Sequence, residues 1–351
     1  MSESSTSPSP VFNVPTPTVW LDGSFVEPEV ARVSAFDAGL QHAVGLFETM
    51  IAREGEVLHL GRHLRRLRTS AAELRLSTTL RIGPLAEAVR AAVTRSGLDD
   101  ARIRLTVTGG DLNLLARRGG RGGPPTLMVV VQPATRYPEV LFERGGRLAV
   151  ADARLNPLDP FSSHKTLAYW SRLSALQDAL AKRCDEALWL SVTNHVCGGS
   201  VSNLVVVRDG TVLSPQVRGE EPSGALRSPV LPGVVRSAVL EWALEEGRPV
   251  ERRLLTIDDV LRAEEVCLVN SSWGVMPIVA VEAAEIGNGR VGEAVAGWRR
   301  RWLGPHPEEP IEEAIDRGTG LEPGADLDPR RGVGPDAEER ESRRPGEADA
   351  E

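Results

Sequence analysis

The chain has 351 residues and a net charge of −8, because 49 acidic side chains outnumber 41 basic ones. The excess acid lies in residues 304–351, which hold 15 acidic and 6 basic side chains. Residues 1–303 are therefore close to neutral, with 34 acidic and 35 basic side chains. This balance excludes a strongly basic nucleic-acid-binding protein, and we expect no nucleic-acid partner.

The two ends of the chain differ in composition from the rest. Residues 1–16 are rich in Ser and Pro, and residues 304–351 combine Pro, Gly and charged side chains with few large apolar ones. Both segments are predicted to be disordered, because they cannot bury enough apolar surface to fold. The first segment does not resemble a signal peptide, and no apolar run is long enough to span a membrane. We expect no membrane partner.

The cysteines indicate a reducing compartment. There are three, Cys184, Cys197 and Cys267, and neither their number nor their spacing suits a disulfide framework or a metal site. We therefore expect a cytoplasmic protein without a bound metal.

Short strand patterns alternate with helix patterns from residue 17 onward. An Asp-Gly turn predicts the first hairpin, and Leu64, Leu67 and Ala71 recur at helical spacing. In the first half we predict strands 18–21, 24–26, 102–108 and 126–131, and helices 63–76 and 84–96. In the second half we predict strands 147–153, 187–192, 204–207, 212–213 and 265–270, and helices 166–180, 233–246 and 292–302.

This order of elements indicates an α/β or α+β protein with two lobes. The predicted organisation is a smaller N-terminal lobe, 17–132, a Pro-containing linker, 133–139, and a larger C-terminal lobe, 140–303.

Lysine is rare in this chain, which has 39 Arg and only two Lys. Arg cannot lose its proton in a protein, whereas a desolvated Lys amine can, and Schiff-base chemistry requires that free amine. Lys182 lies at a predicted helix end, where a solvated positive charge is ordinary. Lys165, in FSSHKTLAYW, lies between a polar loop and an apolar helix near the predicted lobe junction. From composition alone, a surviving surface lysine explains Lys165 equally well.

Three further segments suit an anionic ligand. LPGVVR, residues 231–236, places a glycine at the mouth of a helix, where free amides bind anionic oxygens. VNSSWGVMP, residues 269–277, places two hydroxyls at the end of an apolar strand. HLRRL, residues 63–67, carries Arg66 on an amphipathic helix. Taken singly, these segments are also explained by an ordinary helix start, a polar turn and a solvated arginine.

Taken in order, the segments resemble the fold-type-IV (class IV) pyridoxal-phosphate enzymes, a family of branched-chain aminotransferases, D-amino-acid aminotransferases and aminodeoxychorismate lyases. The resemblance covers about residues 18–302. It includes VWLDGSFV, VSAFDAGLQHAVGLFET, HLRRLRTSA, HKTLAYW, CGGSVSNLVVV, LPGVVR and NSSWGVMPIVAV. It implies a two-lobed fold-type-IV enzyme with pyridoxal 5'-phosphate bound between the lobes, in a homodimer.

The resemblance assigns a role to each matching residue. Lys165 is the catalytic residue and forms the Schiff base with the cofactor. Arg66, Ser271 and the amides at the start of the 231–236 helix bind the phosphate, Tyr169 approaches the phenolic oxygen, and the Ser272 amide faces the substrate carboxylate. The cofactor-binding set is Arg66, Lys165, Tyr169, Leu231, Gly233, Val234, Val235 and Ser271, and the substrate-binding set is Phe47 and Ser272.

One position departs from the family pattern. The family segment V-x-E-G-S-x-S-N reads VCGGSVSN here, from Val196 to Asn203, so that Gly198 stands where the family has a carboxylate. That carboxylate pairs with the pyridine nitrogen and keeps the ring an electron sink. Cys197 and His195 are near in sequence, but neither supplies a fixed negative charge.

The resemblance implies an aminotransferase of amino-acid metabolism. It would move an amino group between a branched-chain or similar apolar or small amino acid and a 2-oxo acid. The first alternative is an aminodeoxychorismate lyase-type β-elimination that gives pyruvate. The second is a pyridoxal-phosphate-binding homologue with weak or no turnover, because of Gly198.

Overall fold

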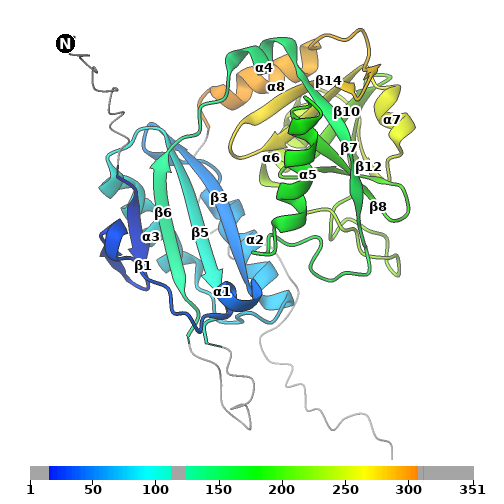
Figure 1. Cartoon of the computed structure of the whole chain (residues 1–351). Coiled ribbons are helices and arrows are strands. Elements are labelled where there is room, and N and C mark those ends of the chain that lie inside the picture. The colour runs from blue at the N-terminus through cyan, green and yellow to red at the C-terminus, as the bar shows by residue number, and fades with distance from the viewer. Residues whose placement is uncertain (1–15, 112–123, 307–310, 312–351) are drawn as a thin grey trace, which may run out of the picture. The chain divides into compact units, whose positions relative to one another are not determined.

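The first of two β-sheets in the described part of the chain is antiparallel throughout and has the strand order β2-β1-β6-β5-β3-β4. Figure 1 labels β1, β6, β5 and β3 of this sheet. The computed structural model describes residues 16–111, 124–306 and 311. The strands are β1 (Thr18–Leu21), β2 (Ser24–Val26), β3 (Gly45–Arg53), β4 (Glu56–Val57), β5 (Ala101–Thr108) and β6 (Leu127–Pro133). The helices of this region are η1 (Pro28–Val30), α1 (Ala38–His42), α2 (Leu60–Glu73) and α3 (Ile82–Ser96).

Alternation along the strands gives the first sheet two different faces. Met50 of β3 and Ile103 and Leu105 of β5 are fully buried in one core with α2 and α3. On the opposite side of β5, Arg102 and Arg104 are only partly buried, and both line a cavity. The sheet therefore presents cations to the cavity because its apolar residues face the helices.

The second sheet has nine strands and is mixed. Its order is β12-β11-β10-β13-β14-β7-β8-β9, with β15 paired to β14, and the β11–β12, β14–β7 and β7–β8 pairs are parallel. Its strands are β7 (Gly146–Leu155), β8 (Glu186–Ser191), β9 (Val196–Gly199), β10 (Asn203–Arg208), β11 (Thr211–Pro215), β12 (Val250–Arg253), β13 (Glu265–Asn270), β14 (Gly274–Val281) and β15 (Ala284–Glu285). Its helices are α4 (Glu139–Arg144), α5 (Trp170–Ala181), α6 (Val234–Glu245), α7 (Ile257–Leu261) and α8 (Glu293–Leu303).

Helices cover both faces of the second sheet, so its strands are apolar on both sides. Val205 and Val207 of β10 pack with α6 and α8, whereas Leu204 and Val206 of the same strand pack in a core with α4 and α7. Each fully buried Val or Leu contributes about 1.5–3 kcal/mol to folding. The continuous apolar run of β10 follows from this double burial.

The predicted α/β class is confirmed, and the hairpin strands and β13 have their predicted bounds. The helix predicted for residues 166–180 is wrong over its first turn, because α5 begins at Trp170. Residues 165–167 instead pair with β3: the Phe47 amide donates to Lys165 O at 2.9 Å, and the Leu167 amide donates to Gly45 O at 3.0 Å. Pairing with β3 holds this segment extended.

The predicted linker, 133–139, runs from the end of β6 to the start of α4. The predicted division into two lobes stays a prediction. The segments 1–16 and 304–351, predicted to be disordered, lie mostly outside the described residues. Among the residues that the structure describes, no helix is long and apolar enough to cross a membrane.

Candidate active site

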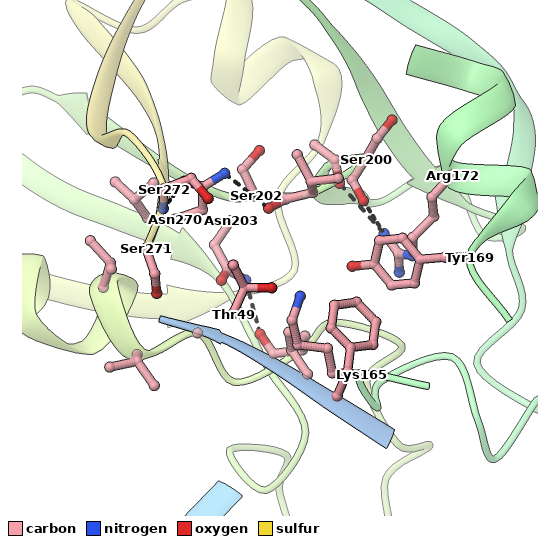
Figure 2. A pocket seen from close by; sticks show the side chains of 18 of the residues that line it. Thr49, Lys165, Tyr169, Arg172, Ser200, Ser202, Asn203, Asn270, Ser271 and Ser272 are labelled. Carbon is pink, nitrogen blue, oxygen red and sulfur yellow. Dashed lines mark hydrogen bonds between the residues drawn. The ribbon is translucent and has the colours of Figure 1, made fainter. Parts of the chain in front are cut away.

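One cavity of about 640 Å³ contains all ten residues predicted for the site. They come from β3, α2, the first turn of α6 and the loops that join elements of the second sheet, and Figure 2 shows several of them around the central space. The predicted residues that line it are Phe47, Arg66, Lys165, Tyr169, Leu231, Gly233, Val234, Val235, Ser271 and Ser272.

Lys165 extends into this cavity beside two aromatic rings. Its Nζ lies 4.3 Å from the centroid of the Phe47 ring and 5.3 Å from that of Tyr169. In Figure 2 its amine lies between Tyr169 and Ser271. Burial favours the neutral phenol, but the positive charges of Lys165 and Arg172 outweigh burial and lower the pKa of Tyr169. The amine and the phenol therefore interact within one part of the cavity.

The N-terminus of α6 forms another wall of the cavity. Its N-cap residue, Gly233, has no side chain with which to cap the helix, and Val234 and Val235 of the first turn line the cavity. A Cβ added to Gly233 would lie 1.8 Å from Oδ1 of Asn203, so only glycine fits. Asn203 also donates from Nδ2 to Leu231 O at 2.9 Å, which fixes the loop before the helix. Such an uncapped helix start binds anions.

Arg66 of α2 reaches the same wall and is held by a buried carboxylate. Its Nη1 donates to Pro232 O at 2.9 Å, and its Nε and Nη2 donate to the two oxygens of Glu48 at 2.8 and 2.5 Å. Burial opposes ionisation of Glu48, but Arg66 and His63 outweigh it, and the pKa of Glu48 falls to about 2. The guanidinium is therefore fixed in direction by an ionised partner.

His63 connects Glu48 to the predicted phosphate-binding hydroxyl. Its Nδ1 lies 2.8 Å from Oε2 of Glu48, and its Nε2 lies 3.2 Å from Oγ of Ser271. Burial is the main cause of its lowered pKa. Sequence reasoning missed both Glu48 and His63. The available signal was the i, i+3 spacing of His63 and Arg66, which places both on one face of α2.

Arg102 and Arg104 supply positive charge to the cavity, and Arg104 lies over the ring of Phe47. The Cζ atom of Arg104 lies 3.8 Å from the centroid of the Phe47 ring. Burial, and then the charge of Arg102, lower the pKa of Arg104. Neither guanidinium makes a hydrogen bond or ion pair with another residue in the described part of the chain, and no described carboxylate lines the cavity. Two unpaired guanidiniums favour a carboxylate ligand.

The Ser272 amide, predicted to face the substrate carboxylate, lies in the turn between β13 and β14. That amide donates to Oδ1 of Asn270 at 2.9 Å, and the Trp273 amide donates to the same oxygen at 3.0 Å. Both amides therefore make hydrogen bonds within this turn, and the role of the Ser272 amide toward a substrate stays a prediction. Ser272 nevertheless lines the cavity.

Gly198 has a backbone conformation that other residues rarely adopt. Its φ is +129°, and an added Cβ would lie 2.8 Å from the carbonyl oxygen of Ser202. Among the described residues around the cavity, its neighbour Cys197 appears, whereas Gly198 and His195 do not. Burial raises the pKa of the Cys197 thiol to about 12, so the thiol stays neutral.

A buried carboxyl group lies behind this turn. Glu186 is fully buried in β8, and its Oε1 accepts a hydrogen bond from the Ser200 amide at 3.1 Å. Its burial raises its pKa. Glu186 supports the backbone of the turn and does not line the cavity.

The donors of the cavity fit a phosphorylated aldehyde cofactor. Arg66, the first amides of α6 and Ser271 converge at one end, and this combination suits phosphate. The amine of Lys165 stands apart from them and is available to an aldehyde. These groups therefore fit pyridoxal phosphate.

The sequence profile of the family described as "Amino-transferase class IV" matches residues 45–281. The chain therefore belongs to the class IV aminotransferases, which are pyridoxal-phosphate-dependent enzymes of fold type IV.

Several relatives support this assignment. The chain is 31% identical over 278 residues to a "putative branched-chain-amino-acid aminotransferase" of Methanocaldococcus jannaschii, with 78% of this chain and 91% of the relative covered. The T.th. branched-chain amino acid aminotransferase with pyridoxamine 5'-phosphate is similar in structure, with a TM-score of 0.72, 27% identity and coverage of 82% and 92%. The 4-amino-4-deoxychorismate lyase of Pseudomonas aeruginosa has a TM-score of 0.67, 29% identity and coverage of 81% and 97%.

Proposed function

We propose that this enzyme moves an amino group between a branched-chain or similar apolar or small amino acid and a 2-oxo acid, with Lys165 holding the cofactor as a Schiff base. The observation that carries the proposal is the convergence of Lys165, Arg66, Ser271 and the uncapped start of α6 on one cavity. The similarity to branched-chain aminotransferases supports the choice of substrate.

Each residue of the proposed site has a distinct task. Arg66, Ser271 and the amides of Val234 and Val235 bind the phosphate and fix the cofactor at that end. Leu231, which lines the cavity just before α6, packs against the ring. Bound pyridoxal phosphate supplies an electron sink for charge that develops at the substrate Cα.

Lys165 and Tyr169 carry the proposed proton chemistry. When its amine is neutral and free, Nζ of Lys165 would take a proton from the substrate Cα as a base and would give that proton back to the bound substrate and cofactor as an acid. Tyr169, with a lowered pKa beside that amine, orients the phenolic side of the cofactor by hydrogen bonding. Arg cannot replace Lys165 here, because a guanidinium does not release its proton.

Arg102, Arg104 and Phe47 form the substrate end in this proposal. Phe47 provides an apolar surface, and its ring also holds the Arg104 guanidinium at 3.8 Å. A carboxylate between the two guanidiniums would relieve their mutual repulsion and would satisfy donors that have no protein partner. This arrangement favours a 2-oxo acid with a second carboxylate as the amino acceptor.

Two alternatives each have an observation in their favour. A β-eliminating lyase is supported by the similarity to aminodeoxychorismate lyase, and an anionic substrate also suits Arg102 and Arg104. Weak or absent turnover is supported at Gly198, since the neighbouring Cys197 thiol is neutral and Glu186 has a raised pKa.

We also propose a homodimer. Large apolar side chains are exposed around the start of α5, and such patches are typical of association surfaces. They are Leu158, Phe161, Trp170 and Leu173, with 74%, 54%, 86% and 48% exposure.

The decisive experiment incubates the holoenzyme with a panel of amino acids and 2-oxoglutarate and assays glutamate and pyruvate separately. Glutamate formed from branched-chain or small amino acids supports the transferase. Pyruvate formed from aminodeoxychorismate without an acceptor supports the lyase. If neither glutamate nor pyruvate forms, the result supports the homologue with weak or no turnover. Lys165→Ala should abolish any product, whereas Lys182→Ala, which removes an exposed amine after α5, should not.

A further inference from the structure

The hydroxyl of Ser271 ends a chain of hydrogen-bonded groups that begins at Glu48. Nδ1 of His63 lies 2.8 Å from Oε2 of Glu48, and Nε2 of the same ring lies 3.2 Å from Oγ of Ser271. The side chains of Glu48 and His63 are 1% and 2% exposed. Because water has almost no access to this pair, its hydrogen bonds must be satisfied within the chain.

The ionised state of Glu48 decides where the imidazole proton lies. Burial of Glu48 opposes its ionisation, but Arg66 and His63 hold its pKa at about 2. The carboxylate is therefore ionised, and its oxygens only accept hydrogen bonds. Nδ1 of His63 must then carry a proton, since two acceptors 2.8 Å apart would repel. Nη2 of Arg66 also lies 3.5 Å from Nδ1, but it already donates to Glu48 at 2.5 Å. The tautomer with a proton on Nδ1 is therefore the one that fits.

This tautomer determines what Ser271 offers to the cavity. In the neutral imidazole Nε2 is an acceptor, and burial favours that neutral form by lowering the pKa of His63. The Ser271 hydroxyl consequently donates its one proton to Nε2 and presents only lone pairs on its other side. A phosphate dianion also presents only acceptors, so Ser271 in this state repels it.

We propose that binding of a phosphate dianion at Arg66, α6 and Ser271 is coupled to uptake of one proton by His63. The proton comes from solvent and bonds to Nε2. Nε2–H then donates to Oγ of Ser271, and the Ser271 hydroxyl turns to donate to a phosphate oxygen. Glu48 and His63 are positioning residues in this account, and it rests on the proposed function, because the dianion is the phosphate of the cofactor.

The charges around His63 support this coupling. Arg66 in the middle of α2 and His59 at its N-cap disfavour the imidazolium, and Glu48 of β3 favours it. Ser271, from the turn between β13 and β14, is neutral. The charge of Glu48 is already paired to Arg66. A new dianion on the far side of Ser271 therefore adds a negative charge that stabilises the protonated form of His63. Without the proton, Ser271 could turn only by leaving a buried Nε2 unpartnered.

The test uses the full chain without cofactor and two probes, inorganic sulfate and pyridoxamine 5'-phosphate. Sulfate stays a dianion near neutral pH, so a proton taken up with it must go to the protein. The ¹⁵N NMR signals of His63, assigned with His63→Asn, report its tautomer and its pKa. Saturating probe should raise that pKa by at least about one pH unit. The affinity for sulfate should fall about tenfold per pH unit between the free and bound pKa of His63.

Matched variants separate this coupling from simple anion binding. Ser271→Ala keeps Arg66 and α6 but removes the hydrogen-bonded link to His63, so the probe should raise the pKa of His63 much less than in the wild-type protein. Ser272→Ala removes a neighbouring hydroxyl that also lines the cavity and should keep the full response. His63→Asn retains a donor toward Glu48, loses the titrating ring and should give a flat pH dependence.

Two results would overturn the inference. Binding of both probes with no change in the pKa of His63, or with the same pH dependence in Ser271→Ala, would refute the coupling alone. Failure of the wild-type protein to bind pyridoxamine 5'-phosphate at any pH would refute both the coupling and the proposed function.

Discussion

The buried carboxylate of Glu48 holds the phosphate end of the cavity together, and Glu48→Gln removes its charge while keeping its shape. Its oxygens accept hydrogen bonds from Nε and Nη2 of Arg66 and from Nδ1 of His63. A glutamine amide offers one oxygen and one NH₂ group. In at least one of these three contacts the glutamine NH₂ group therefore faces another N–H donor, and the hydrogen bond is lost.

The pH linkage of Glu48 gives the magnitude. Its ordinary pKa of 4.5 falls to about 2 in the folded protein, chiefly because the charge of Arg66 outweighs burial. This difference corresponds to about 3 kcal/mol of folding free energy at neutral pH. Since the folded pKa is the lower one, the contribution is complete above pH 4.5 and is lost as the pH falls toward 2. Removing one partner of a buried ion pair typically costs about 3–5 kcal/mol of folding free energy, and the value obtained from the pKa of Glu48 agrees with that range.

Urea unfolding of the cofactor-free protein over a pH series measures this effect. We expect Glu48→Gln to lower the free energy of unfolding by about 3 kcal/mol at neutral pH, with the deficit shrinking below pH 4.5. Glu241→Gln is the control. Glu241 forms an ion pair with Arg62, their side chains are 50% and 27% exposed respectively, and such a pair should contribute less than about 1 kcal/mol. A deficit for Glu48→Gln as small as that of the control, or one that does not change with pH, would refute the reasoning.

Three further predictions concern other parts of the molecule. Gly198→Ala should destabilise the protein by about 1–3 kcal/mol, because a Cβ meets Ser202 O at 2.8 Å, and an unchanged melting temperature would contradict this. Arg102→Leu should raise KM for 2-oxoglutarate about tenfold or more, the equivalent of about 1.4 kcal/mol, and should leave KM for pyruvate nearly unchanged. Equal changes for both acceptors in steady-state kinetics would argue against a second carboxylate at that position. Trp170→Glu should give monomers in light scattering, and a retained dimer would exclude the α5 surface as the interface.

Local signals explain which elements were predictable. The hairpin of β1 and β2 depends on the adjacent Asp22 and Gly23, and its bounds were predicted correctly. β3 escaped prediction because it is buried on both sides and Glu48 and Thr49 interrupt its apolar residues, so its sequence has neither strand nor helix periodicity. The start of α5 was misplaced because residues 165–167 pair with β3, and such a partner, more than 100 residues away in sequence, leaves no local signal.

The candidate site was predictable where a family motif carries it. The ten predicted residues do line one cavity, although each segment alone had an ordinary explanation. Glu48 was missed because it belongs to the unpredicted strand β3. The pattern of residues 102–108 predicted a strand, but it did not predict which way Arg102 and Arg104 face. The structure turns that side toward the cavity, which only the packing of the first sheet on α2 and α3 decides.

The strain at Gly198 also changes how the missing carboxylate can be tested. Restoring a glutamate there would place a Cβ against Ser202 O in a backbone with φ of +129°. The Gly198→Glu variant would therefore test backbone strain together with ring electronics. An acid introduced at Cys197, which lines the cavity, separates the two effects.

The rarity of lysine allows a direct test of the central claim, because the chain has only two side-chain amines, Lys165 and Lys182. Borohydride reduction of the holoenzyme followed by peptide mass spectrometry would show which amine holds the cofactor. We predict one phosphopyridoxyl group on the peptide that contains Lys165 and none on Lys182. A label on Lys182, or no label in a protein saturated with pyridoxal phosphate, would contradict the account.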